Sequence, residues 1–253
     1  MPVSVSTLVW GKFLASWIFA AAALVLTFPF WLTVNYLGAP DNGVIAGSYL
    51  GSWVLAGCML AISQTMSALT KNQVIALVLA VIVNFLFFLS GVEYVLGFFR
   101  MFAPAAVVDM VASFSFLVHF GTIAGGLLEM RDVVFFVSVI LLFNVTTILV
   151  VSFRTSGTSR WLKSTQAAYY VLFFLLLLTA FTGLNLTANR FLRTEQYDFT
   201  QEKLHTLTPS SRRVLENLPE PVTAKLYYSP VLGQRNPELR LMYDRVRLLL
   251  EQF

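Results

Sequence analysis

The stretch VVFFVSVILLFNVTTILVVSF, residues 133–153, contains no charged residue and decides the fold class. The hydrocarbon core of a bilayer is about 30 Å thick and accommodates roughly 20 apolar residues in a helix. This stretch is therefore long enough to cross a membrane with some tilt. Asp132 and Arg154 flank it, so the two ends of the predicted span are well marked.

Four further apolar stretches of similar length lie along the chain. They predict transmembrane helices at Leu14–Tyr36, at Val44–Leu69, from Val74 to about Leu96, and at Ala167–Leu186. The first is too long for the core of a signal peptide and is not followed by a small-residue cleavage pattern. The second is rich in Gly, Ala and Ser, which let helix backbones approach closely, so we expect it to pack among other helices.

The segment from Phe98 to Asp132 fits this pattern less well. Its apolar run, Ala105–Phe120, would form about 24 Å of helix at about 1.5 Å per residue, and it contains Asp109 and His119. We predict a re-entrant or interfacial segment here. The alternative is a sixth short span, which would reverse the orientation of everything downstream.

The composition separates a membrane body from a polar tail. Only 12% of the 253 residues are charged, against about 25% in an ordinary soluble domain. Residues 1–189 hold 7 Lys/Arg and 5 Asp/Glu, while residues 190–253 hold 10 and 8. The net charge of +4 is explained by basic residues beside membrane spans, so we expect no nucleic-acid partner. A single cysteine, Cys58, permits no intrachain disulfide and no cysteine metal cluster.

The loop charges predict the orientation. With the amino terminus inside, the outer segments carry two basic residues, Arg100 and Arg131, against five acidic ones. Because inner loops are enriched in Lys and Arg, we expect a cytoplasmic amino terminus, and five spans then place the tail outside. The inner segments carry five basic residues and no acidic one: Lys12, Lys71, Arg154, Arg160 and Lys163.

The tail after Asn189 has mixed helix and strand patterns. Thr208-Pro209 opens a short helix, the alternation over Val222–Tyr228 predicts a strand, and Asn236-Pro237 opens a second helix. One strand and two helices do not close a sheet, so the tail is predicted to be the start of a larger domain. The predicted fold class is a membrane all-α bundle of about five transmembrane helices plus a re-entrant or interfacial segment, followed by a partial α/β extracytoplasmic domain.

The sequence carries no familiar catalytic motif. It has no Gly-x-x-x-x-Gly-Lys-Ser/Thr loop, no Gly-x-Ser-x-Gly elbow and no His-Glu-x-x-His pair, so we expect neither an enzyme nor a bound cofactor in this chain. His119 and His205 have no carboxylate or cysteine at ligand spacing, which argues against a metal site and favours an interfacial helix end for His119. Glu93 lies near the outer end of a predicted span, so we expect it at the membrane interface rather than in an ion-coupling role.

Two asparagines lie deeper in the predicted spans. Asn84 and Asn144 are candidates for lining a transport path. Hydrogen bonding between helices is the alternative interpretation, and the one favoured by how polar residues are used inside membranes.

Three short motifs follow one another along the chain: GKFLA (residues 11–15), PDNG with SYLG (40–43 and 48–51) and SALTKNQ (67–73). Together they resemble the gliding-motility type of permease in the type-2 ABC exporter superfamily. In the tail, YDFT (197–200), LTPSS (207–211), Val214-Leu215, and Pro221-Val222 with Lys225-Leu226-Tyr227 are similar to the start of the auxiliary protein encoded beside such permeases. The motif positions are Asp41, Gly43, Tyr49, Gly51, Thr70, Lys71 and Asn72.

The resemblance implies three parts: a partial permease at 1–165, an anchor helix of the auxiliary part at 166–189 and an incomplete extracytoplasmic domain at 190–253. Such permeases usually have six spans, two of which precede the Gly-Lys stretch, and the auxiliary domain is far longer than residues 190–253. We therefore expect this chain to be a fragment that lacks both ends. Four permease spans plus the anchor account for the five predicted spans.

The resemblance also implies a function. The chain would be the permease subunit of an exporter in the bacterial inner membrane, with a periplasmic tail. Its partners would be a separate ATPase subunit that binds ATP, a second permease copy or homologue, the remainder of the auxiliary domain and the lipid bilayer.

The segment before the first span would dock on the ATPase through Pro2, Ser6, Gly11 and Lys12, and a frayed terminus is the alternative. The competing functions are a membrane-anchored scaffold that binds a partner and an intramembrane enzyme. Lipid, polysaccharide and peptide substrates are all compatible with the sequence.

Overall fold

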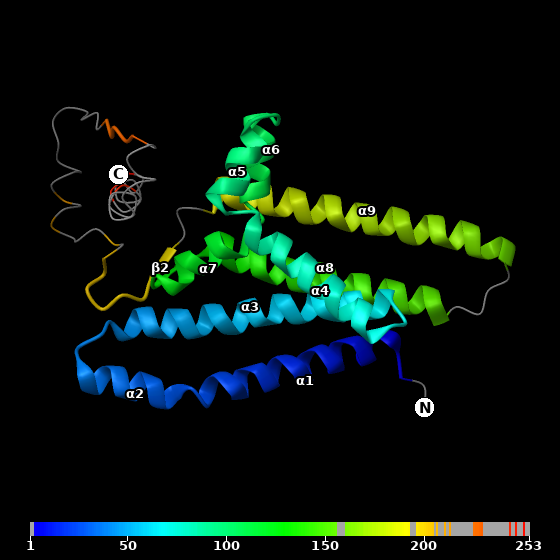
Figure 1. The fold of residues 1–253 in the computed structure, drawn as a ribbon, viewed down its shortest axis with the longest axis horizontal. Helices are drawn as coiled ribbons and strands as arrows, with labels where there is room; N and C mark the ends of the chain where they lie inside the picture. Colours follow the sequence, from blue (N-terminus) through cyan, green and yellow to red (C-terminus); the bar gives the residue numbers. More distant parts are fainter. Residues whose placement is uncertain are drawn as a thin grey trace.

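The computed structural model describes residues 3–155, 160–192, 196–204, 206, 210, 213, 225–229, 243, 246 and 250. Almost all of the ordered secondary structure is helical (Figure 1). The elements, in chain order, are α1 (Val5–Val25), α2 (Phe28–Leu37), α3 (Asn42–Leu69), α4 (Gln73–Leu89), α5 (Glu93–Arg100), α6 (Ala105–Ala112), α7 (Phe116–Ala124), β1 (Leu127–Glu129), α8 (Met130–Thr155), α9 (Arg160–Phe191) and β2 (Gln196–Asp198).

Polar side chains define where several helices begin. A side-chain oxygen at the N-cap accepts hydrogen bonds from the first free backbone N–H groups, which stabilises a helix by about 1 kcal/mol. The Oδ1 atom of Asp41 accepts from Gly43 N and Val44 N at the start of α3. The residues that cap in this way are Ser4, Asp41, Asn72 and Ser115.

Long helices that follow one another in the chain run antiparallel, and they share one apolar core (Figure 1). Helix α3 packs against α1, α4, α7 and α8, and α9 packs along α8. Two tryptophans join α1 to α3: Trp17 Nε1 donates to Trp53 O at 2.9 Å, and the two rings stack with centroids 4.5 Å apart. The fully buried core includes Phe13, Cys58, Ile62, Phe116, Phe135, Phe136 and Val139.

Four helical segments in the described part are long and apolar enough to cross a membrane: Val5–Leu37, Asn42–Leu69, Met130–Thr155 and Gln166–Phe191. The first is α1 together with α2. The predicted spans at Val44–Leu69, Val133–Phe153 and Ala167–Leu186 each lie within one of these helices, so their locations are confirmed. The outward surface of the Val5–Leu37 segment is apolar, with Phe19 77% exposed and Leu26 80% exposed, as a lipid-facing surface requires.

The predicted span from Val74 to Leu96 is wrong at its outer end. Helix α4 ends at Leu89, and α5 continues after a bend of 78°. The structural reason is Gly91, which lies against Ser115: a Cβ on Gly91 would be 2.1 Å from Ser115 Oγ. A fifth crossing is therefore reached only if the bent pair α4 and α5 counts as one span.

The segment between α4 and α8 does not form one helix. The apolar run Ala105–Phe120 is divided between α6 and α7 by residues 113–115. In Figure 1, α5 and α6 project away from the long helices, while α7 lies against the bundle. None of these short helices is long enough to form the alternative sixth span. Glu93 begins α5 and pairs with Arg100 at 2.6 Å, and its interfacial placement stays a prediction.

The partial α/β domain predicted for the tail is not confirmed. Residues 225–229 are described and lie outside any strand, while residues 222–224 of the predicted strand lie outside the described residues. Ser210, Arg213, Tyr243 and Val246 are helical, in agreement with the two predicted helices. The residues predicted to open these helices, Thr208-Pro209 and Asn236-Pro237, lie outside the described residues.

Candidate functional site

The most polar part of the buried interior lies where the tail meets the bundle. Helix α7 begins after its cap Ser115, and the chain then turns at Gly126 into β1. Gly126 has φ +84°, a conformation that favours glycine. The turn brings α7 back alongside the first turn of α8. We call the set His119, Glu129, Arg131, Asp132 and Asn189 the ionic junction.

A histidine and an aspartate form the centre of the ionic junction. His119 Nδ1 lies 2.6 Å from Asp132 Oδ1, and His119 Nε2 lies 2.9 Å from the carbonyl oxygen of Ser113. His119 is 6% exposed and Asp132 is 0% exposed. The His119 ring also stacks on Phe135, with centroids 4.0 Å apart. The second carboxylate oxygen, Asp132 Oδ2, is buried and accepts no hydrogen bond from the described residues.

An arginine connects this pair to β1 and α9. Arg131 Nε pairs with the carboxylate of Glu129 and lies 3.7 Å from Asp132 Oδ1. Arg131 Nη1 donates to Asn189 Oδ1 at 3.2 Å, which ties α8 to the end of α9. Because Glu129 is only 3% exposed, these charges interact with little screening by water.

The tail docks on the bundle next to the ionic junction. Strand β2 pairs antiparallel with β1, in the register Leu127 opposite Asp198 and Glu129 opposite Gln196. Phe199 N donates to Gly126 O at 2.8 Å and extends the pairing by one bond. The ionic junction and the strand pair therefore share Glu129.

Aspartate side chains hold the turn that follows β2. Asp198 Oδ1 accepts from Thr200 N at 2.9 Å, and Asp198 Oδ2 accepts from Thr206 Oγ1 at 3.0 Å. Asp41 Oδ2 accepts from Gln201 N at 3.0 Å, while its other oxygen caps α3. Asp41 thus binds the tail and starts a transmembrane helix with the same carboxylate.

The motif positions of the first half of α3 lie at this same end. A Cβ on Gly43 would be 1.7 Å from Phe199 O, and one on Gly51 would be 3.2 Å from Ile123 Cγ2. Tyr49 instead points to the connection between α1 and α2, where its hydroxyl donates to Thr27 O at 3.1 Å. Close packing of the tail and α7 on α3 thus gives Gly43 and Gly51 a structural role.

The other motif positions lie at the opposite end, in the connection between α3 and α4. Asn72 caps α4 through Val74 N and Ile75 N, and Lys71 is exposed. Arg154, at the end of α8, donates to Leu69 O at 2.6 Å and to Thr70 O at 3.4 Å. We call the end of the bundle that carries Lys12, Lys71 and Arg154 the basic end.

The residues predicted to dock on an ATPase lie on the first turns of α1. Ser6, Gly11 and Lys12 are exposed, and Pro2 lies outside the described residues. On the opposite side of the helix, Val9 and Phe13 are buried. The exposed side is therefore available for a contact, and its use in ATPase docking stays a prediction.

The two candidate path-lining asparagines are buried. Asn84 is 6% exposed and Asn144 is 0% exposed. Each donates to a carbonyl of its own helix, Asn84 Nδ2 to Ala80 O at 2.8 Å and Asn144 Nδ2 to Ile140 O at 2.9 Å. Their Oδ1 atoms accept no hydrogen bond from the described residues. Among the described residues these two amides therefore form no hydrogen bond between helices, and their role in lining a path stays a prediction.

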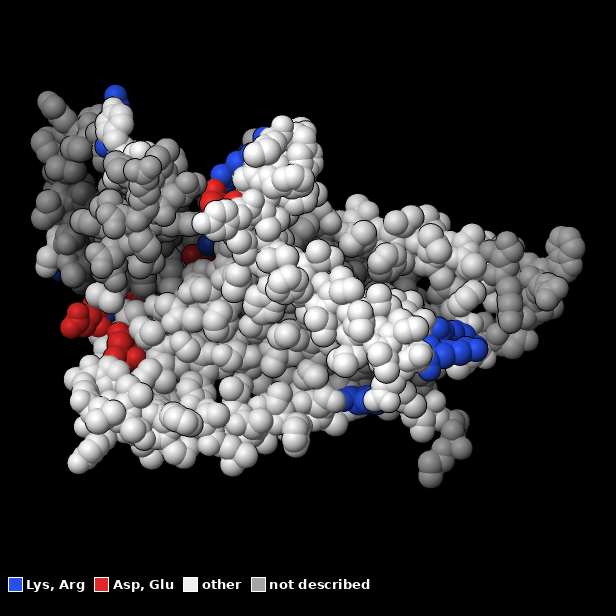
Figure 2. Space-filling model, viewed as in Figure 1, with Lys and Arg blue, Asp and Glu red and all other residues white. Residues whose placement is uncertain are grey.

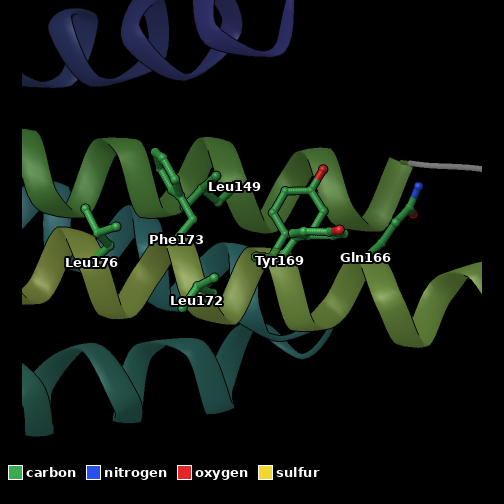
Figure 3. A pocket seen from close by; sticks show the side chains of 7 residues that line it. Leu149, Gln166, Tyr169, Leu172, Phe173 and Leu176 are labelled. Atoms are coloured by element: carbon green, nitrogen blue, oxygen red, sulfur yellow. The ribbon is translucent and has the colours of Figure 1, made fainter.

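The groove between α8 and α9 is lined mainly by aromatic and aliphatic side chains. It has a volume of about 500 Å³, and Leu149, Tyr169, Phe173 and Leu176 are among the residues that line it (Figure 3). Gln166 stands at one end of the groove. Among the described residues, the lining contains no carboxylate, imidazole or amine.

His119 has a direct carboxylate partner, Asp132, which the sequence did not indicate, and its placement at a membrane interface stays a prediction. The spacing of these residues carries no known signal, and the pairing depends on the turn at Gly126. No group of three or more His, Cys, Asp or Glu in the described residues is placed to hold a metal ion. The hydrogen bonds and ion pairs of the ionic junction join α7, β1, α8 and α9.

Comparison with known proteins gives one match. Residues 201–253 match a family described as a domain of unknown function, DUF7088. No curated protein and no solved structure matches the chain. The match lies wholly within the tail, directly after the strand pair that docks it on the bundle.

Proposed function

We propose that this chain is the membrane-spanning permease subunit of an ABC-type export system, driven by ATP hydrolysis in a separate subunit. Residues 1–165 would be the permease part, 166–189 the anchor and 190–253 the start of an extracytoplasmic auxiliary domain. The resemblance to gliding-motility permeases implies that four of the family's six permease spans are present in this chain. The observation that carries the proposal is the break between α4 and α8, because it leaves four crossings before α9 if the bent pair counts as one.

The charge distribution supports an orientation for this permease. In Figure 2 the basic end shows Lys and Arg and no Asp or Glu on the visible face, while acidic residues lie toward the tail. Because basic residues concentrate on the cytoplasmic side, we place the amino terminus and the basic end in the cytoplasm. The tail is then periplasmic, in a multi-pass protein of the bacterial inner membrane.

The basic end is the proposed site of coupling to the ATPase. It presents the exposed residues Ser6 and Lys12 on α1 and the exposed Lys71 in the connection between α3 and α4. Arg154 ties α8 to the connection between α3 and α4, so a displacement there would move two spans together.

The test is copurification of an ATPase with the tagged chain from native membranes. We expect an ATP-hydrolysing subunit with the wild-type chain, a crosslink to it from Ser6→Cys, and a several-fold lower yield with Lys12→Glu or Lys71→Glu. The matched control is Arg100→Glu, which reverses a charge at the other end of the bundle and should leave the yield unchanged. If none of these variants lowered the yield of the ATPase, docking at this site would be refuted. A crosslink that formed only from the segment 154–163 would refute it as well.

A membrane-anchored scaffold is the second candidate function. The observation that favours it is the docking of the tail, through β1–β2 and the Asp41 carboxylate, in a fixed position on the bundle. A scaffold would present the tail to a partner without an ATPase. Recovery of the chain with a tail-binding protein and with no ATP hydrolysis would favour this function over transport.

A further inference from the structure

Two grooves lie along one seam between α8 and α9. The first, of about 500 Å³, lies near the basic end, and the second, of about 410 Å³, lies farther along the same two helices. Their lining positions recur every three or four residues, from Val133 to Leu149 on α8 and from Gln166 to Leu184 on α9, so each helix contributes one continuous face. At about 1.5 Å per residue this α8–α9 seam is about 24 Å long, which is most of the thickness of a bilayer core.

The lining of the first groove suits a flexible chain better than another helix. Helices that associate within a membrane do so through small residues, which let their backbones approach closely. Among the described residues, the lining of this groove contains no Gly, Ala, Ser or Thr and is made of bulky side chains such as Tyr169 and Phe173. Both α8 and α9 are long and apolar enough to cross a membrane, so exposed lining residues such as Leu176, which is 62% exposed, face hydrocarbon.

The polar atoms of the first groove gather at its end nearest the basic end. Gln166 and Tyr169 lie there, whereas Phe173 and Leu176 lie farther along α9 (Figure 3). Gln166 Oε1 is buried and accepts no hydrogen bond from the described residues. A buried acceptor without a donor is unfavourable, so this oxygen favours a ligand that brings a hydroxyl group to the end of the groove.

A positive charge lies just beyond this end of the groove. Arg154 is exposed and follows Leu149 on α8 by about one and a half helical turns. Its guanidinium has five N–H donors, and its bonds to two carbonyl oxygens at the end of α3 leave others free. Among the described residues no carboxylate pairs with it. The segment 156–165 adds Arg160 and Lys163 and no acidic residue, and such basic clusters beside membrane spans attract anionic lipids.

We propose that the α8–α9 seam binds a membrane phospholipid whose headgroup is anionic and carries a hydroxyl group, as in phosphatidylglycerol. One acyl chain lies in the seam, the phosphate lies beside Arg154, and a headgroup hydroxyl donates to Gln166 Oε1. The acyl chain fills the space between α8 and α9 and so stabilises the packing of α9 on the bundle. This site requires only that α8 and α9 cross the membrane, and it is independent of the proposed transport function.

Photocrosslinking in vesicles tests the proposal. The full chain is reconstituted in phosphatidylcholine with a trace of phosphatidylglycerol that carries a photoactivatable acyl chain, and the labelled residues are mapped by mass spectrometry. We expect labelling at Leu149 and Phe173 to exceed, at least several-fold, that at Leu77, an exposed residue of α4 that lines neither groove. Unlabelled phosphatidylglycerol should lower the labelling of the seam without changing that of Leu77. Equal labelling of the seam and of Leu77, or labelling of the seam that no competitor lowers, would overturn the proposal.

Two variants test the two parts of the site, and the competition in the wild-type chain stands if either variant fails to fold. Leu149→Trp should fill the groove and lower the labelling of Phe173 at least several-fold, whereas the matched control Leu77→Trp should behave as the wild type. Gln166→Leu should lose the preference for phosphatidylglycerol over phosphatidylcholine. Unchanged labelling in Leu149→Trp, or an unchanged preference in Gln166→Leu, would overturn the proposal. A disulfide between two chains that carry Phe173→Cys and Cys58→Ala would also overturn it, because a second copy would then occupy the seam.

Discussion

Gly43 shows how closely the tail approaches the bundle. A Cβ at this position would be 1.7 Å from Phe199 O, and the clashing atom belongs to the backbone, which cannot rotate away as a flexible side chain can. We expect Gly43→Ala to displace the tail and to lower the amide protection of residues 196–199 at least several-fold. Gly183→Ala is the control, because no other atom lies within 4 Å of the added carbon. Equal protection in the two variants would show that Phe199 does not lie against Gly43.

At the scale of residues, the sequence predicted individual positions with a role more successfully than pairs of residues in contact. Asp41 and Gly43 were identified by resemblance, and the structure gives both a role in docking the tail. The His119–Asp132 pair was missed because no local rule links a residue within a helix to one 13 positions later. The pair exists only because the chain reverses at Gly126, where the backbone adopts a left-handed conformation.

Between elements, buried threonines join α3 to α8. Thr65 Oγ1 lies 2.9 Å from both Phe143 O and Thr147 Oγ1. Hydrogen bonds between transmembrane helices contribute about 0.6 to 1.7 kcal/mol. We expect Thr65→Val to lower the free energy of unfolding in a detergent titration by about that amount. Thr179→Val is the control, because Thr179 is exposed and bonds only to Leu175 of its own helix among the described residues, so a loss of similar size there would contradict this assignment.

At the scale of elements, hydropathy predicts a helix well and its end less well. The spans within α3, α8 and α9 follow directly from long uncharged runs. The same reasoning extended the third span beyond Leu89, because residues 90–92 are not polar enough to interrupt the pattern. The bend that ends α4 depends on the packing of Gly91 on Ser115, a contact between segments that hydropathy does not report.

For the whole molecule, the orientation can be tested from two exposed positions. Lys71 lies in the connection between α3 and α4, and the side chain of Gln201 is exposed in the tail. With Cys58 replaced by Ala, Lys71→Cys should be protected from an impermeant thiol reagent in intact cells whose outer membrane has been permeabilised, whereas Gln201→Cys should react. Full labelling of both after the inner membrane is opened is the control. The opposite pattern would invert the orientation.

The backbone of the tail forms hydrogen bonds with the bundle, so we expect that the tail does not fold by itself. Phe199 N donates to Gly126 O, and Gln201 N donates to Asp41 Oδ2. A segment of residues 190–253 lacks both acceptors and the whole of β1, and ordering its backbone costs about 1–2 kcal/mol per residue. We therefore expect the isolated segment to show fast amide exchange at residues 196–201 and no cooperative thermal transition, whereas the full chain protects the same amides. A sharp melt of the isolated segment with protected amides would contradict this. It would mean that the tail folds first and that β1 only docks on a strand already in place.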